Sequence, residues 1–469
     1  MLLPKTILSN EGRILCNTIN HPLRTVKNKI ENFFKFENID NLKSEICIKQ
    51  NFDDLNVPLT HPVRNIRDTF YLNENYIKNY NSILSTYYIP FDILNTFYKY
   101  YLSNKLLSHD KIILKRTHMT SHLNDLLKGS YTNVIYTGQV YRKDEIDKYH
   151  YPIFHQTDGF LIKPEMFNVE IELKQKLEQL IYYLFNKNNI EIKWESDTSF
   201  PFTHPSYELY IKRKQDNKWI EILGCGKIKN EVLAMSLYHN HINKIIENEI
   251  TIYNKTLLNS FQQKFLSNEK ETIRQSHLIN HLCNKQLNHN IQIKINELLK
   301  SINYQGWAFG IGLERLCMLL YDINDIRLFW SNDKRFINQF KENQITTFRP
   351  FSNFPCIQKD ISFYIKQYFN ETSFFQICRD IANDNIEQIQ KIDKYYDPKN
   401  NQTSLCYRIT YRSHNKNLTH NEVNGIQNKI VQILLAPIEG VPKGDSGFFG
   451  CNIIKFILYT NGLSLSKGD

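Results

Sequence analysis

Residues 306–330 read GWAFGIGLERLCMLLYDINDIRLFW, a stretch that predicts a strand followed directly by a buried helix. Its first half alternates apolar residues with small ones, which predicts a strand, and Leu313, Leu316 and Leu320 then recur at the spacing of a buried helix. The glycines do not form a GxGxxG pattern, and no βαβ unit surrounds them, so the stretch does not predict a dinucleotide-binding loop.

Two glycines and one arginine make this stretch a candidate binding site. Gly310 and Gly312 leave one face of the expected strand bare, which allows a planar base to lie against it. Arg315 is the strong cation in the first turn of the apolar helix that follows. A glycine-rich strand that packs closely on a helix, with Arg315 at the surface, is the alternative.

The chain before residue 229 predicts an antiparallel sheet flanked by helices. Strand patterns at 134–142, 206–214 and 218–226 are separated by polar turns, and helical patterns occupy 21–34 and 166–186. Because strands and helices do not alternate regularly, a doubly wound parallel sheet is not expected.

From residue 348 the pattern follows the order β-α-β-β-α, which is typical of a ferredoxin-like domain. In its last strand Arg408, Thr410 and Arg412 share one face, so this face could bind a polyanion or simply be solvated. The fold class is therefore α+β. The expected organisation is an N-terminal segment with a helix at 1–49, a first domain at 50–340 with an Asn/Lys-rich insertion at about 229–303, a linker at 341–347, the ferredoxin-like domain at 348–435 and an atypical tail at 436–469.

Composition indicates a folded, basic protein. The 469 residues include 58 Lys and Arg against 48 Asp and Glu, a net charge of +10 that favours polyanionic partners without proving them. Nine cysteines form no CxxC pair, which argues against a disulfide framework. No run approaches the roughly 18 apolar residues of a membrane span, so no membrane association is expected.

A charged hairpin is predicted where residues 140–159 read VYRKDEIDKYHYPIFHQTDG. Arg142 and Asp144 lie two residues apart, as do Gln156 and Asp158, so each pair can project from one face of a strand. A guanidinium suits a phosphate, and an amide with a carboxylate suits an ammonium group. An exposed hairpin with ordinary surface charges is the alternative.

An aromatic pair follows at 199–208, SFPFTHPSYE, where Phe200 and Phe202 flank a proline in an extended segment. Two rings on one side of a stiff strand can line a pocket for an aromatic group, although they can equally be core.

A carboxylate lies in the apolar strand at 219–227, WIEILGCGK. Glu221 must either pair with a basic neighbour or hold a cation. Gly224 and Gly226 end the strand in a turn where the backbone can approach a flat ligand.

Together these motifs resemble the monomeric, organellar-type phenylalanyl-tRNA synthetases, which are class II enzymes. The resemblance is collinear over most of 10–435, and it includes NHPL at 20–23, QNFDDLNVPLTHPVR at 50–64 and RTHMTSH at 116–122. It implies a class II antiparallel sheet flanked by helices and a C-terminal ferredoxin-like domain that binds the tRNA anticodon arm.

The resemblance also implies residue roles. It implies that ATP is bound by Arg142, Asp144, Gly310, Gly312 and Arg315, and that the two arginines are the catalytic residues. It implies that phenylalanine is bound by His118, Thr120, Gln156, Asp158, Phe200, Phe202, Gly224 and Gly226. Glu221 is the candidate Mg²⁺ ligand, and Arg408 and Arg412 are candidate tRNA contacts. Asp158 stands where the family has Glu, Thr120 where it has Ser, and the substrate loop that the family carries after Phe160 is missing here.

The implied function is ligation of L-phenylalanine to tRNA(Phe), with ATP as co-substrate and Mg²⁺ as cofactor, by a monomer of the mitochondrial matrix or of a plastid-like organelle. Two alternatives remain open. The chain could be a catalytically impaired tRNA-binding paralogue, or the catalytic subunit of a heterotetrameric phenylalanyl-tRNA synthetase.

Overall fold

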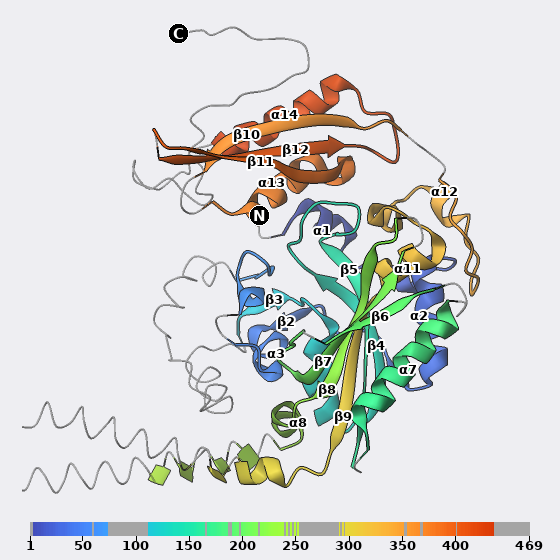
Figure 1. Ribbon diagram of the computed structural model, residues 1–469, viewed down its shortest axis with the longest axis vertical. Coiled ribbons are helices and arrows are strands. Elements are labelled where there is room, and N and C mark those ends of the chain that lie inside the picture. Colours follow the sequence, from blue (N-terminus) through green and yellow to red (C-terminus); the bar gives the residue numbers. More distant parts are fainter. Residues whose placement is uncertain are drawn as a thin grey trace, which may run out of the picture.

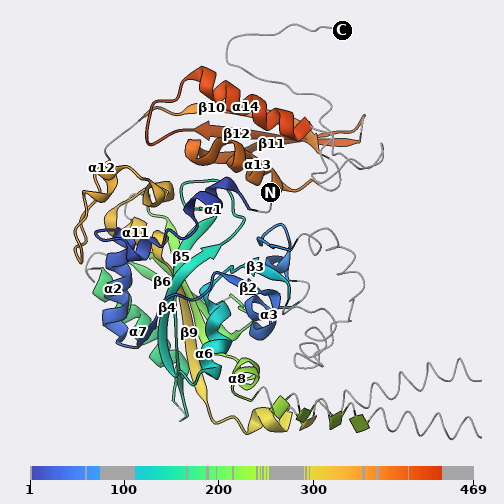
Figure 2. The same cartoon turned by 180° about the vertical axis from the view of Figure 1, so that it is seen from behind.

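The computed structural model contains a large α+β body and a smaller C-terminal domain that packs on one end of it (Figures 1 and 2). It describes residues 3–435 except for 59–60, 74–110, 165–166, 186–189, 197, 214–215, 239–240, 243, 246–247, 250, 253–289, 291–292, 295, 351–353, 366–368 and 400. The tail at 436–469 and much of the expected insertion therefore lie outside the described residues. No helix in the described part of the chain is long and apolar enough to cross a membrane.

The body is built on a seven-stranded sheet in the order β1-β4-β5-β9-β8-β7-β6. All neighbours are antiparallel except β1 and β4, which are parallel. The strands are β1 (Glu37–Ile39), β4 (Asn133–Tyr141), β5 (Ile153–Lys163), β6 (Ile192–Glu195), β7 (Thr203–Lys212), β8 (Trp219–Ile228) and β9 (Gln305–Gly312). A two-stranded ribbon, β2 (Glu45–Cys47) and β3 (Ile113–Lys115), lies beside them. The predicted antiparallel sheet is confirmed.

Helices cover both faces of the sheet. The long ones, α2 (Pro22–Phe34) and α7 (Val169–Leu184), cover one face together with α11 (Leu313–Tyr321). The helical patterns that predicted α2 and α7 are confirmed. The shorter helices α3 (Ile48–Asn51), α6 (Leu123–Lys128) and α8 (Asn230–Leu237) lie on the opposite face. Two further short helices, α1 (Lys5–Asn10) and α12 (Lys334–Ile337), complete the body.

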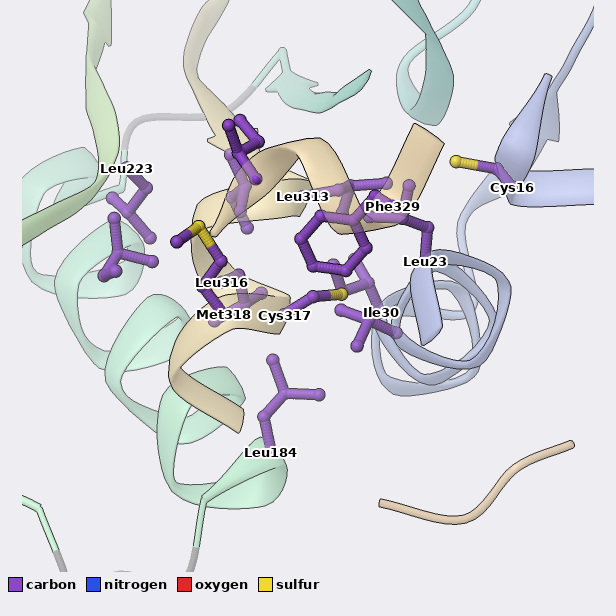
Figure 3. Close-up of a cluster of buried hydrophobic side chains, with 14 of the residues drawn as sticks. Cys16, Leu23, Ile30, Leu184, Leu223, Leu313, Leu316, Cys317, Met318 and Phe329 are labelled. Atoms are coloured by element: carbon purple, nitrogen blue, oxygen red, sulfur yellow. The ribbon is translucent and has the colours of Figure 1, made fainter. Parts of the chain in front are cut away.

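The helix that follows the glycine-rich strand is the centre of the larger core. Figure 3 shows Leu313, Leu316 and Cys317 of α11 between Leu23 and Ile30 of α2 and Leu184 of α7. Of the three leucines predicted to face the core, Leu313 and Leu316 are fully buried there, and Leu320 is half-buried at its edge. This packing fixes α11 against the sheet, so that its first turn meets the ends of β8 and β9.

The C-terminal domain has the predicted order of elements. It comprises β10 (Ile357–Ile365), α13 (Glu371–Ala382), β11 (Ile386–Asp397), β12 (Gln402–Tyr411) and α14 (His420–Leu435). The strands form an antiparallel sheet in the order β10-β12-β11. Tyr407, Ile409 and Tyr411 point into a core shared with α13 and α14, as the alternation in β12 predicts.

A glycine in β5 allows β4, β5 and β9 to pack closely. A Cβ on Gly159 would lie 2.6 Å from Cδ1 of Ile135 and 2.8 Å from Cε1 of Phe309. We expect Gly159→Ala to destabilise the body by about 1–3 kcal/mol because these apolar side chains must move. Gly425→Ala, in the exposed surface of α14 with nothing within 4 Å of its Cβ, should instead be neutral or stabilising by up to about 1 kcal/mol. Urea unfolding of the full chain compares the two variants, and equal effects would contradict this packing.

Candidate active site

A cavity of 360 Å³ opens on the sheet face that carries the bare glycines. Its walls come from β5, β8 and β9, from the start of α11, from the segments at 118–120 and 200–202, and from the loop between β4 and β5. Twelve of the sequence-predicted residues line it, namely His118, Thr120, Arg142, Asp144, Gln156, Asp158, Phe200, Phe202, Gly224, Gly310, Gly312 and Arg315, and Glu221 does so as well. Gly226 is not among the lining residues; it lies against Pro205 and Thr203 in the pairing of β8 with β7.

Two guanidinium groups reach this cavity from distant parts of the chain. Arg142, at the end of β4, donates from Nε to the carbonyl of Thr117 at 2.9 Å and lies 5.4 Å above the ring of Phe154. Arg315, in the first turn of α11, donates from Nη1 to the Glu221 carboxylate at 3.2 Å. Both side chains are half-buried, so each keeps donors for a ligand such as a phosphate.

The aromatic pair borders the cavity as an open slot. The rings of Phe200 and Phe202 are nearly parallel, with 5.9 Å between centroids and an interplanar angle of 12°. A Cβ at Gly224 would lie 2.7 Å from Cζ of Phe200, so only a glycine allows this ring to lie on β8. Since neither ring is fully buried, the pair is available to an aromatic ligand.

A buried carboxylate lies on the cavity face of the sheet, beside the bare part of β9. Asp158 pairs with Gly310 in the register of β5 and β9, and its Oδ2 accepts a 2.6 Å hydrogen bond from the Thr120 hydroxyl. Its Oδ1 has no partner among the described residues. Burial raises the pKa of Asp158 to about 7, although the Thr120 hydrogen bond and Arg142 act in the opposite direction. An oxygen that lacks a partner in a buried carboxylate suits a cationic ligand group.

Two further polar side chains, those of Gln156 and His118, line the cavity. Gln156 accepts from the Met119 amide at 3.3 Å, which orients its side chain beside Asp158. Burial lowers the pKa of His118 to about 3, so its imidazole is neutral, and its Nδ1 also has no partner in the described part of the chain.

A buried contact that the sequence did not predict joins β5 to α11. Glu314, the neighbour of Arg315, accepts from the His155 amide at 2.8 Å, and its second oxygen lies 2.7 Å from Nδ1 of His155. Both side chains are almost inaccessible to solvent. The pair therefore fixes the position of the first turn of α11 relative to β5. The only signal in the sequence is a carboxylate inside an apolar helix, which does not identify its partner.

Other lining residues also escaped sequence reasoning. Val57, His61 and Val63 approach from the segment between the two strands of the ribbon, after β2, and Tyr149 and His150 approach from the loop between β4 and β5. These residue types carry no periodic or charge signal of their own, so only the fold reveals their place.

The chain matches the family model for the class II core domain (F) of tRNA synthetases over residues 8–246 and 293–340, and that for the ferredoxin-fold anticodon binding domain over 352–440. The first match shows that the body built on the seven-stranded sheet is the core domain of a class II tRNA synthetase.

Similar proteins identify the family within this class. The chain is 32% identical to the chloroplastic/mitochondrial phenylalanine--tRNA ligase of Arabidopsis thaliana, covering 91% of this chain and 79% of the relative. Identity is 30% to the mitochondrial phenylalanine--tRNA ligase of Mus musculus, over 93% and 85% of the two chains. It is also 30% to that of Saccharomyces cerevisiae, over 87% and 83%. The chain belongs to the phenylalanine--tRNA ligase family.

The raised pKa of Asp158 implies that this site lowers the stability of the fold above neutral pH. The folded-state pKa of about 7 exceeds the usual value of 3.8, so unfolding becomes easier as pH rises from about 4 to 7. We expect Asp158→Asn, which keeps the Thr120 hydrogen bond, to be more stable than the unaltered chain at pH 8, by at most about 4 kcal/mol. The difference should vanish near pH 4. Urea unfolding at both pH values checks this, and a variant less stable at pH 8 would contradict it.

Proposed function

We propose that this chain activates L-phenylalanine with ATP and transfers it to the terminal adenosine of tRNA(Phe). Its family membership supports this activity. The observation that carries the proposal is the convergence of Arg142 and Arg315 on one cavity beside the Phe200–Phe202 slot.

In the first step the phenylalanine carboxylate attacks the α-phosphorus of ATP, which yields phenylalanyl-adenylate and pyrophosphate. Phe200 and Phe202 hold the ring, while Gln156 and Asp158 hold the ammonium group. His118 and Thr120 complete that side of the site, with Thr120 orienting the Asp158 carboxylate. No protein nucleophile is needed, because alignment of the reactants lowers the barrier.

The arginines neutralise the charge on the nucleotide during this step. Arg142 binds the α-phosphate, Arg315 binds the γ-phosphate, and Asp144 contacts the nucleotide from the loop after β4. Gly310 and Gly312 form the surface on which adenine lies. Fixed cations in a partly enclosed site stabilise developing charge without reorganisation.

A divalent cation fits beside Arg315. Glu221 on β8 and Glu208 on β7 are close enough that Glu221 contributes to a raised pKa of Glu208, although burial is the larger cause. Among the described residues no group of three or more metal-binding side chains occurs, but Mg²⁺ needs only one or two carboxylates when phosphates supply other ligands. We propose Glu221 as the main ligand; when bound, the ion offsets charge on the phosphates.

In the second step a ribose hydroxyl of the tRNA takes the phenylalanyl group. The C-terminal domain would bind the anticodon arm, consistent with its family match. Arg408 binds Asp360 through two hydrogen bonds of 2.8 and 2.9 Å, and Arg412 pairs with Glu387 at 2.8 Å. Each arginine would have to exchange this carboxylate for a phosphate, so their tRNA contacts stay a prediction.

We further propose that the chain acts as a monomer in the mitochondrial matrix, since several relatives are named as mitochondrial enzymes. A plastid-like organelle is the alternative, as one relative is named chloroplastic and mitochondrial. The fused anticodon-binding domain favours a self-sufficient enzyme over a catalytic subunit. The presence of both arginines in one cavity disfavours a catalytically impaired paralogue.

Phenylalanine-dependent ATP–pyrophosphate exchange by the purified chain tests the proposal. We expect Arg142→Gln and Arg315→Gln each to lower kcat/KM at least about 100-fold, because each removes charge stabilisation in the transition state. Arg335→Gln, which alters an exposed arginine paired with Asp333, is the matched control and should be unaffected. Exchange that is absent from the unaltered chain, or that survives both active-site substitutions, would refute the assignment.

The cation site has its own test. We expect Glu221→Gln to raise the Mg²⁺ concentration for half-maximal exchange by about tenfold, since a neutral amide is a weaker ligand than a carboxylate. Glu191→Gln, which alters the partner of Lys212 at 3.0 Å outside the cavity, should leave the Mg²⁺ titration unchanged. An unchanged titration for Glu221→Gln would remove this residue from the metal site.

A further inference from the structure

The loop at 142–152, between β4 and β5, has two sides with different neighbours. Its inner side lines the cavity with Asp144, Tyr149 and His150. Asp147 stabilises a turn within the loop by accepting from the amides of Tyr149 and His150, both at 2.7 Å. The loop is therefore one wall of the cavity, and any contact that fixes its outer side also positions that wall.

The outer side is bound by the C-terminal domain. Ile146 is only 5% exposed, and its side chain belongs to the hydrophobic core of that domain, together with Phe375 and Ile389. The backbone continues the contact, because the amide of Ile389 on β11 donates to the carbonyl of Ile146 at 2.9 Å. A residue of the active-site loop thus completes the core of another domain.

A buried arginine holds the residues next to Ile146. Arg379 on α13 donates to the carbonyl of Glu145 at 2.9 Å and lies 3.5 Å from that of Asp144. Its side chain is 7% exposed, and a buried guanidinium needs such acceptors. Lys148 adds an ion pair with Glu387 at 3.0 Å. The C-terminal domain therefore binds the backbone carbonyls of residues 144–146 and the side chain of Lys148.

We propose that the C-terminal domain takes part in amino-acid activation, in addition to any contact with tRNA. It does so by holding the 142–152 loop in the shape that presents Asp144 and Arg142 to the nucleotide. Ile146 and Arg379 are positioning residues in this scheme, since neither lines the cavity. The inference rests on the nucleotide-binding role proposed above for Asp144 and Arg142.

The proposal predicts an effect on one substrate and not on the other. The phenylalanine slot is formed by Phe200 and Phe202, in the segment before β7, and by Gly224 of β8, whereas the 142–152 loop lines the part of the cavity proposed for the nucleotide. A loosened loop should therefore raise the KM for ATP and leave the KM for phenylalanine unchanged. General loss of folded protein would instead lower the apparent kcat and leave both KM values as they were.

The test compares two variants of the full chain with a matched control. Ile146→Ala removes the side chain that enters the C-terminal core, and Arg379→Met removes the donors to the loop carbonyls. Ile430→Ala makes the same isoleucine truncation at a fully buried position in α14, on the side of the domain away from the body (Figures 1 and 2). Hydrogen exchange of residues 142–152 is measured alongside the exchange kinetics.

We expect Ile146→Ala and Arg379→Met each to raise the KM for ATP about tenfold and to accelerate hydrogen exchange in the loop. Ile430→Ala should change neither quantity. An unchanged KM for ATP in both loop variants, or an equal rise in Ile430→Ala, would overturn the inference while leaving the proposed function intact. Absence of phenylalanine-dependent exchange from the unaltered chain would overturn both.

Discussion

The pairing of β5 with β4 on one side and β9 on the other is the constraint on which the site depends. This register places Asp158 opposite Gly310, so that the carboxylate lies on the cavity face of the sheet, in the space that a side chain at Gly310 would need. The same strand brings Gln156 to the cavity and His155 to Glu314, which fixes the first turn of α11 and therefore Arg315. Strand pairing thus converts separated sequence motifs into one binding surface.

The same arrangement buries polar atoms that have no hydrogen-bond partner among the described residues. Asp158 keeps an oxygen without a partner in the described structure, and its pKa is raised to about 7 by burial. The imidazole of His118 is buried and held neutral. Groups left in this state destabilise the empty protein and gain their interactions when a ligand of complementary charge binds.

Sequence patterns correctly predicted the features that depend on neighbouring residues, namely the helices and strands. Period-two and helical spacing correctly predicted β4, β7, β8, α2, α7 and α11, together with the order of elements in the C-terminal domain. Residue types in their motifs, together with the family resemblance, predicted thirteen of the residues that line the cavity, including Arg142, Phe200 and Arg315. Contacts between distant segments could not be read in this way. The pairing of Glu314 with His155, and the place of Ile146 in the C-terminal core, depend on which surfaces meet. A carboxylate in an apolar helix does not identify its partner, and Ile146 does not differ locally from an ordinary loop residue.

In the proposed site Arg142, Arg315 and the rings of Phe200 and Phe202 bind one activated amino acid. A crystal structure of the full chain with a non-hydrolysable phenylalanyl-adenylate analogue tests this arrangement directly. The account predicts the phenyl ring against Phe200 and Phe202, the phosphate mimic within hydrogen-bond distance of Arg142, and the amino group at Asp158. An analogue bound elsewhere, or bound in this cavity with its ring away from both phenylalanines, would contradict it.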